Sequence, residues 1–289
     1  MRIAAFIIAF FIASFVKAEP LLLAGGNEMF LVDSNAAAAG KIEKLWRWSG
    51  ADAKDLPDGE RKAFEHLDEC KPAEGGTKIL ICASNGGCAL LDRTTQRLLW
   101  RAHVTNAHSL TLLPKNRIVV ASSLSGDQLV LFDLNSAAPD KPIFKTPLHS
   151  AHGVVWDEER HCLWSLNFDE LRSYDLEQWD ADHPALKLRH SYPLPNQDGH
   201  DLLAVPSSKD LLLTTEKSVQ LFDRDQGTFR PHPELGSVAG IKSVSIYPKT
   251  GQLVWSEWKA TVHLLSPNGQ ITFPGAHPYK ARWLVEAGR

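Results

Sequence analysis

The chain has 289 residues, with 31 Lys and Arg against 34 Asp and Glu, so its formal net charge is −3. This balance, together with the lack of a long basic block, argues against binding to nucleic acid or to an anionic membrane surface. The four cysteines are too few for a fold built on disulfides. Cys82 could form a disulfide with Cys88 or with Cys70, or these residues and Cys162 could all be buried free thiols.

The first 18 residues have the pattern of a secretory signal peptide. Arg2 supplies the positive charge, "IAAFIIAFFIASF" is an apolar stretch too short to span a bilayer comfortably, and Ala18 is the small residue before the cleavage point. We therefore expect export to the periplasm or beyond, without a membrane anchor. The mature chain, residues 19–289, is long enough for one large domain.

A short motif recurs along the mature chain, in which apolar residues end in an aspartate. It stands at "MFLVD", "CALLD", "LVLFD", "LRSYD" and "VQLFD", which end at Asp33, Asp92, Asp133, Asp175 and Asp223, and a degraded copy, "VHLLS", ends at Ser266. Most copies are about 41 to 48 residues apart. One longer gap is explained by a polar insertion at residues 50–65, which we expect to lie on the surface.

Each motif belongs to a group of four short apolar segments separated by Gly, Asn or Asp turns. Segments of this kind are typical of strands, and four antiparallel strands in about forty residues indicate a β-propeller blade. The sequence predicts an all-β fold with six blades. The mature chain begins on a second strand, while residues 280–286 form a first strand without followers, so we expect residues 280–286 to pair with residues 21–24 and close the ring.

The first strands of the six groups begin with a histidine or a lysine, and in a propeller these strands line the central channel. Aligned in this way, one mouth of the channel gathers His66, His108, His152, His200, Lys242 and Lys280. One interpretation is structural: a duplicated blade kept a histidine that bonds to the neighbouring backbone. The other is functional: imidazoles on consecutive blades meet at a metal ion or an anionic substrate, and neutral imidazole is a common metal ligand. The two lysines favour the functional interpretation, because lysine cannot accept a hydrogen bond.

Other residues near this mouth are candidates for contact with a ligand. Arg282 shares a strand face with Lys280, and Glu69 and Asp201 stand beside the ring. Trp258 lies in a turn, where a large aromatic side chain suits stacking on a sugar ring. On the functional interpretation, His108, His152 and His200 would bind a divalent metal ion whose identity the sequence leaves open.

The blade pattern and the histidines at the channel mouth resemble secreted propeller enzymes that act on acidic sugars, notably the oligogalacturonate lyases. The resemblance implies a divalent metal held by His108, His152 and His200 and a base at Lys242 or Lys280. The chain departs from those lyases in its blade count, since they are typically larger and seven-bladed. "HLDECKP" and the six blades also resemble an uncharacterised family of secreted bacterial propellers.

These features predict a secreted, monomeric lyase that cleaves an acidic, uronate-containing oligosaccharide or polysaccharide by β-elimination. Arg282 or the metal would neutralise the carboxylate, Lys242 or Lys280 would remove the alpha proton, and His66 or water would protonate the leaving oxygen. Trp258, Glu69 and Asp201 would contact the substrate. The alternative is a propeller without catalytic activity that binds a ligand or a protein.

Overall fold

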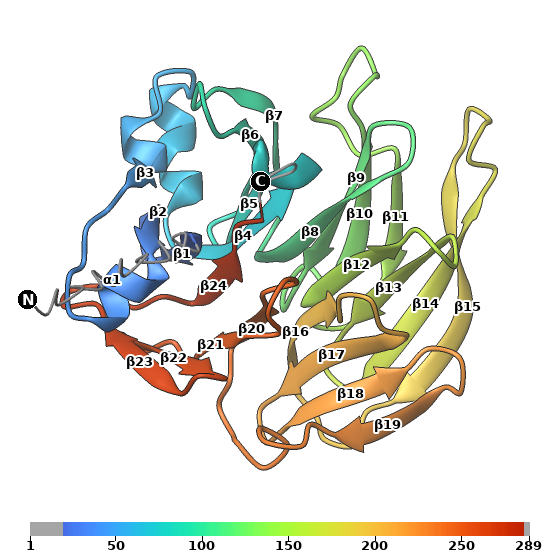
Figure 1. Ribbon diagram of the computed structural model, residues 1–289. Coiled ribbons are helices and arrows are strands. Elements are labelled where there is room, and N and C mark those ends of the chain that lie inside the picture. Colours follow the sequence, from blue (N-terminus) through green and yellow to red (C-terminus); the bar gives the residue numbers. More distant parts are fainter. Residues whose placement is uncertain (1–19, 286–289) are drawn as a thin grey trace, which may run out of the picture.

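The computed structural model describes residues 20–285 and is a six-bladed β-propeller. Six four-stranded antiparallel sheets stand in a ring around a central channel, as Figure 1 shows. We number the blades along the chain, so that the first contains β24, β1, β2 and β3 and the sixth contains β20 to β23. The prediction of an all-β fold with six blades is confirmed.

The two inner strands of each blade lie nearest the channel. The innermost strands are β24 (Lys280–Trp283), β4 (Leu67–Ala73), β8 (Ala107–Leu113), β12 (Gly153–Asp157), β16 (Gly199–Ala204) and β20 (Ser243–Ile246). The second strands are β1 (Pro20–Gly25), β5 (Lys78–Ala83), β9 (Arg117–Ser122), β13 (Cys162–Leu166), β17 (Asp210–Thr215) and β21 (Leu253–Ser256).

The two outer strands of each blade complete the sheets. The third strands are β2 (Glu28–Asp33), β6 (Gly87–Asp92), β10 (Gln128–Asp133), β14 (Glu170–Glu177), β18 (Val219–Asp223) and β22 (Thr261–Leu265). The outermost are β3 (Trp46–Trp48), β7 (Leu98–His103), β11 (Phe144–Pro147), β15 (Ala185–Pro193), β19 (Thr228–Pro231) and β23 (Gly269–Thr272). The short helices are α1 (Ser34–Ala38), η1 (Gly50–Asp52), η2 (Asp58–Phe64) and η3 (Glu74–Gly76).

The ring is closed by its two ends, as predicted. β24 pairs antiparallel with β1, with Leu21 opposite Trp283 and Ala24 opposite Lys280. In Figure 1 the red strand β24 lies between the blue first blade and the channel. These hydrogen bonds complete the first blade with a strand that follows the sixth blade along the chain. The first and last blades are thereby held together, and every innermost strand of residues 20–285 is paired.

The repeated aspartate has a local structural role at the end of the third strand. In four of the five motifs its carboxylate accepts a hydrogen bond from a backbone N–H two or three residues further on, at Asp33, Asp92, Asp133 and Asp223. Such Asx turns bend the chain out of a strand. Asp175 differs, because β14 continues past it and its carboxylate pairs with Arg189. The motif is therefore a turn signal that recurs in most blades.

Hydrophobic clusters between neighbouring blades form the core. Each of the six clusters in residues 20–285 combines strands of two adjacent blades, such as Leu22 and Ile79 between the first and second. Burying one such side chain is worth about 1.5–3 kcal/mol. The insertion at residues 50–65 contributes to this core, because Leu56 and Phe64 are buried and Phe64 packs edge-on against Trp48.

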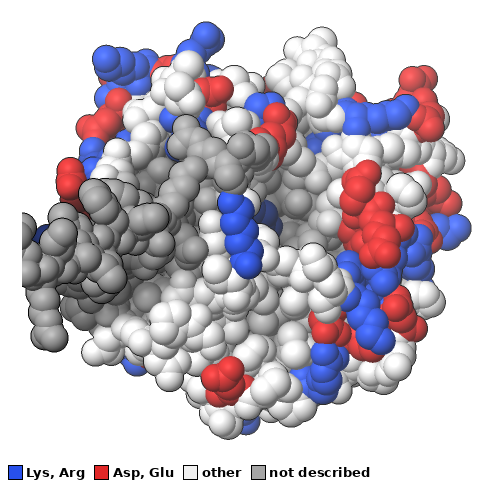
Figure 2. Space-filling view, viewed as in Figure 1, with Lys and Arg blue, Asp and Glu red and all other residues white. Residues whose placement is uncertain are grey.

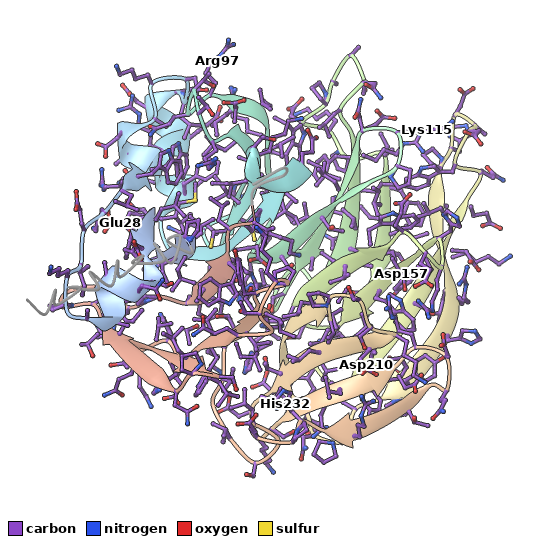
Figure 3. The ribbon with its side chains drawn as sticks, in the orientation of Figure 1. Glu28, Arg97, Lys115, Asp157, Asp210 and His232 are labelled. Atoms are coloured by element: carbon purple, nitrogen blue, oxygen red, sulfur yellow. The ribbon has the colours of Figure 1, made fainter. Side chains whose placement is uncertain are left out.

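Ion pairs between charged side chains also connect neighbouring blades. Asp157, which ends β12 in the fourth blade, accepts a hydrogen bond at 2.7 Å from Arg224 of the fifth blade, and both side chains are buried. Figure 3 labels this aspartate together with Asp210, which pairs with the more exposed Arg230. On the face shown in Figure 2, acidic and basic side chains are interspersed and neither sign forms a broad patch among the described residues.

The expected signal peptide, residues 1–18, and the last four residues lie outside the described part of the chain. Within residues 20–285, no helix is long and apolar enough to cross a membrane.

All four cysteines are buried free thiols in the structure. Cys82 and Cys88 stand opposite each other on β5 and β6, yet no disulfide joins them. Burial raises the pKa of each thiol, to about 11 for Cys162 and further for the others. Since the thiolate is the reactive form, none of the four is activated for chemistry.

We expect the native protein not to react with a thiol reagent such as dithionitrobenzoate, because the four thiols are buried and protonated. After denaturation without a reductant, all four should react. Colorimetric titration before and after addition of guanidinium measures both numbers. Release of only two thiols would show that a disulfide forms, and fast reaction of the native protein would contradict the burial.

Candidate functional site

The six innermost strands begin at one mouth of the channel, and the backbone register identifies which residue each contributes. His152, Lys242 and Tyr279 each donate their backbone N–H to the second strand of their own blade, one residue before the sheet ladder begins. In the other three blades a β-bulge interrupts the pairing at the same level, and the extra residue is Asp68, His108 or His200. We call these six residues the ring, and their end of the channel the histidine mouth.

Two members of the ring differ from the sequence alignment, while His108, His152, His200 and Lys242 occupy their expected places. Asp68 takes the position expected for His66, which stands two residues earlier in a left-handed conformation with φ 57°. Tyr279 takes the position expected for Lys280. The sequence alignment matched residue types, and in these two blades a basic residue stands within two positions of the one that the backbone pairing places in the ring.

Two neighbouring imidazoles of the ring are fixed in the same tautomer. Nδ1 of His108 lies 3.1 Å from the carbonyl oxygen of Asn106, and Nδ1 of His152 lies 2.9 Å from that of Ser150. A carbonyl only accepts, so each Nδ1 carries the proton and each Nε2 keeps its lone pair. The two rings are 4.5 Å apart between centroids.

The electrostatic surroundings keep these imidazoles neutral. Burial lowers the pKa of His108, although Asp68 opposes part of the shift. Burial, reinforced by the neighbouring His108, lowers the pKa of His152 well below its usual value. Desolvation disfavours the charged form of a buried base, so both rings are unprotonated near neutral pH. The histidine mouth therefore presents two neutral nitrogen bases.

His200 belongs to a polar group with side chains from neighbouring loops and the sixth blade. Its Nε2 lies 2.6 Å from Nζ of Lys242 and 3.1 Å from Oε2 of Glu216, and Nζ of Lys242 donates to the same carboxylate oxygen at 2.8 Å. Nδ1 of His200 is buried and has no hydrogen-bond partner among the described residues. Burial, followed by the charge of Lys242, lowers the pKa of this histidine as well.

The same group is the place where the described residues could hold a metal ion. Ligand atoms of Asp198, His200 and Glu216 all lie within 4.8 Å of one another, and carboxylate and imidazole suit a divalent cation. The ammonium of Lys242 contacts two of these three ligands, however, and so takes the place of a cation. A metal ion would fit only if Lys242 moved away. Of the expected metal ligands, His200 belongs to this group and His108 and His152 do not.

The remaining charged candidates lie deeper in the channel and bind one another. Arg282 donates two hydrogen bonds to Glu69, both at 3.0 Å, and two to Asp201, both at 2.7 Å. Lys280 donates to Asp201 at 3.0 Å and to the carbonyl oxygen of Lys242 at 3.0 Å. We call these four residues the buried ion-pair cluster, since none exposes more than 5 % of its surface.

The cluster is fully charged. Burial alone would raise the pKa of Asp201, but Arg282 and Lys280 hold it far below its usual range. The pKa of Glu69 is lowered in the same way, against the effect of its burial, mainly by Arg282. Because every charge has a partner within the cluster, these side chains are not free to contact a substrate at the histidine mouth.

An aromatic side chain and a cavity adjoin the mouth. Trp258 is 59 % exposed, lies in a left-handed turn and packs edge-on against Tyr279 at 5.9 Å. It lines a cavity of about 890 Å³ together with His66, His277 and Arg47. The structure thus brings Trp258 and His66 together beside the ring.

The family of the chain follows from a comparison of its sequence with known families. Residues 27–288 match the family described as "Family of unknown function (DUF6528)". The chain belongs to this family. No curated protein matches the DUF6528 chain.

A solved structure supports the fold of this DUF6528 protein. The hydrazine synthase of Kuenenia stuttgartiensis is similar with a TM-score of 0.51 and 12 % sequence identity. The similarity covers 65 % of this chain and 55 % of that one, so the DUF6528 chain spans about half of its length. A likeness at this identity concerns the fold alone.

Sequence reasoning overlooked two members of the DUF6528 site. Asp198 stands two residues before His200. Asn106 and Ser150 stand two residues before His108 and His152, so the repeated spacing could have indicated that Asp198 also lies at the mouth. No sequence signal pointed to Tyr279, because the adjacent Lys280 is a basic residue like Lys242 and was aligned in its place. The position of Tyr279 became visible only through the pairing of β24 with β1.

The lowered pKa values predict how stability changes with pH. The unfolded DUF6528 chain binds protons to its histidines near pH 6.5, while folded His108, His152 and His200 bind them only at lower pH. Their contribution is present above pH 6.5 and is lost as the pH falls, so the free energy of unfolding should decrease on acidification. Each unit of lowered pKa corresponds to about 1.4 kcal/mol.

Urea unfolding of wild type and His152→Asn between neutral and mildly acidic pH measures this effect. The asparagine amide can still donate to Ser150 but does not titrate, so the variant should show the weaker pH dependence. Equal slopes in the two proteins would contradict the prediction.

Proposed function

We propose that this protein binds an acidic, uronate-containing glycan at the histidine mouth and cleaves it by β-elimination. The observation that carries the proposal is the combination, in one ring, of imidazoles whose Nε2 atoms have no hydrogen-bond partner among residues 20–285 with the amino group of Lys242. Elimination needs a base for the alpha proton and a cation for the carboxylate. The ring supplies both kinds of group.

The roles follow from the charge state of each residue. Lys242 donates hydrogen bonds to Glu216 and His200. The side chain of Glu216 is half exposed, so it can move away from Lys242. We propose that the carboxylate of the substrate then takes the place of Glu216 and binds Lys242. Because Nζ of Lys242 is already bonded to Glu216 and His200, we propose a histidine rather than Lys242 for proton removal.

His108 is the better placed base of the two fixed imidazoles. It is more exposed than His152, its pKa is lowered less, and its blade stands opposite that of Lys242 in the ring. In the reaction, Nε2 of His108 takes the alpha proton, a carbon–carbon double bond forms and the glycosidic oxygen leaves with a proton from water. Trp258 and His66 line the adjoining cavity, where a neighbouring sugar residue would stack.

The test uses the purified protein with polygalacturonate and alginate, and with dextran as the uncharged control. We expect one of the acidic polymers to give an unsaturated product, detected by its ultraviolet absorbance, and dextran to give none. Measurements with added zinc, manganese or chelator show whether a divalent ion takes part. Failure of every acidic polymer to give product would overturn the catalytic part of the proposal.

A second candidate is a propeller that binds an acidic glycan without cleaving it. It is favoured by the buried ion-pair cluster, in which the expected catalytic groups Arg282 and Lys280 are bound to carboxylates. Saturable binding of polygalacturonate or alginate without an unsaturated product would select this candidate. Absence of both binding and product would overturn both.

We also propose that the chain is exported as a monomer after cleavage behind Ala18. The support is the sequence pattern of residues 1–18, with the positive charge of Arg2, the apolar segment and the small residue Ala18. The intact mass of protein isolated from the periplasm or medium should correspond to residues 19–289, and its sedimentation to one chain. A retained Met1 in the cytoplasm or a dimer would contradict these points.

A further inference from the structure

The opposite end of the channel contains a second cavity. The innermost strands end there, and together with the segments that follow them they line a space of about 480 Å³. Its wall is largely apolar and includes Val154, Trp156, Leu202, Ile246 and Trp283. The volume is within the range of small-molecule sites. We call it the second-mouth cavity.

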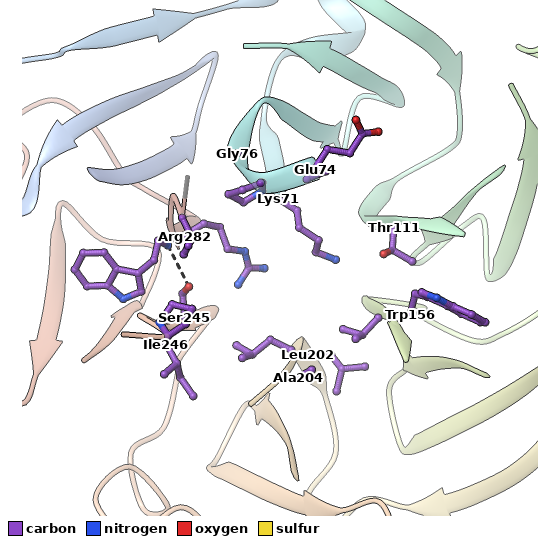
Figure 4. Close-up of a pocket in the computed structure, with 18 of the residues that line it drawn as sticks. Lys71, Glu74, Gly76, Thr111, Trp156, Leu202, Ala204, Ser245, Ile246 and Arg282 are labelled. Atoms are coloured by element: carbon purple, nitrogen blue, oxygen red, sulfur yellow. Dashed lines mark hydrogen bonds between the residues drawn. The ribbon is translucent and has the colours of Figure 1, made fainter. Parts of the chain in front are cut away.

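Two cations lie on the floor of this cavity. In Figure 4 the side chains of Lys71 and Arg282 extend from two neighbouring blades toward its centre. The guanidinium of Arg282 is saturated, because Glu69 and Asp201 accept four of its hydrogen bonds and the carbonyl oxygen of Val244 a fifth. Lys71 differs from Arg282 because the acceptors of its hydrogen bonds are all neutral, so a ligand carboxylate could replace one of them.

Lys71 lacks a carboxylate within hydrogen-bond distance. Its Nζ contacts the hydroxyl of Ser109 at 3.2 Å and the carbonyl oxygens of Leu110 and Val154 at 3.0 and 2.9 Å. The nearest carboxylate oxygen, from Glu69, is 3.8 Å away and already bonded to Arg282. About a fifth of the side chain remains exposed, on a residue that lines the cavity.

An ammonium held by neutral groups in apolar surroundings is poorly stabilised. Burial lowers the pKa of Lys71, and the more distant Glu69 offsets this only in part. An anion placed in the cavity would add a counter-charge that Lys71 does not share with Arg282, as it shares Glu69, and apolar walls would favour a ligand whose remainder is hydrophobic. We propose that the second-mouth cavity binds a small carboxylate with an apolar body, whose charged group contacts Lys71.

This site is separate from the histidine mouth. The buried ion-pair cluster fills the channel between them, and no ring residue lines the second-mouth cavity. The proposal does not depend on the glycan, so either can fail alone. A charge at the base of an apolar pocket selects an amphipathic acid, whereas every side chain of the ring at the histidine mouth carries a polar group.

The test is isothermal titration calorimetry with octanoate and with octanamide, which has the same chain but no charge. We expect saturable binding of octanoate and about tenfold or weaker binding of octanamide. Lys71→Met should remove this preference. Ala204→Trp should abolish binding of both ligands, because Ala204 lines the cavity at an exposed position where a large side chain would fill it without disturbing Lys71.

Lys145→Met, at an exposed lysine of β11, is the matched control and should bind octanoate like wild type. If Lys71→Met does not fold, Ala204→Trp still tests the place of binding, and octanamide still tests the charge. The proposal is overturned if octanoate does not bind, if octanamide binds equally well, or if binding survives in Ala204→Trp.

Discussion

Replacing Arg282 with methionine should lower the free energy of unfolding by about 3–5 kcal/mol, because two buried carboxylates lose their main partner. Glu69 is fully buried and Asp201 nearly so, and Arg282 bonds to both. Arg282 also belongs to β24, which closes the ring. Lys280 would remain as the one ammonium hydrogen-bonded to Asp201. Denaturant unfolding measures the loss.

Arg101→Met is the matched control, since Arg101 also pairs with a carboxylate, that of Glu60, but both side chains are exposed. An exposed ion pair is worth about 0–1 kcal/mol, so this variant should lose little. Adding Glu69→Gln and Asp201→Asn to Arg282→Met should restore part of the loss, because no unpaired charge remains. Equal losses for Arg282→Met and Arg101→Met would contradict the importance assigned to the cluster.

Replacing Lys242 with methionine should lower turnover of an acidic glycan by about 10²–10³-fold, the usual effect of removing one group that stabilises a developing negative charge. Methionine keeps the length of the side chain but cannot neutralise a carboxylate. Lys242 is part of the ring and contacts His200 and Glu216. Initial rates of unsaturated product, with binding measured in parallel, separate lost turnover from lost affinity.

Lys259→Met serves as the control for this variant. Lys259 is exposed, stands next to Trp258 and pairs with Glu257, so its loss changes the charge of the protein by the same amount. It should leave turnover nearly unchanged. Comparable loss in both variants, or full activity of Lys242→Met, would contradict the role of Lys242.

The fold could be predicted from the sequence because its signals are local and repeated. Each aspartate that ends a third strand, such as Asp133, fixes a turn through its own neighbours, so it marks a blade without knowledge of the rest. Closure was predictable for a related reason. The chain contains five complete sets of strands and one set divided between its ends, and only their pairing completes six sheets.

The site was less predictable because it depends on contacts between distant segments. Arg282 and Glu69 are 213 positions apart, and nothing near either one indicates that they pair rather than bind a substrate. The bulges at Asp68, His108 and His200 likewise depend on how two strands align. Strand type can be inferred from composition, whereas a shift of one residue along a strand cannot.

The central claim is that an acidic glycan binds at the histidine mouth. Nuclear magnetic resonance of the imidazole nitrogens, assigned with single His→Asn variants, tests it most directly in a titration with trigalacturonate. The account predicts saturable shifts for His108, His152 and His200, with no change at His161 and His183, which lie in turns away from the ring. Spectra that do not change at the three ring histidines, at concentrations where calorimetry detects binding, would contradict it.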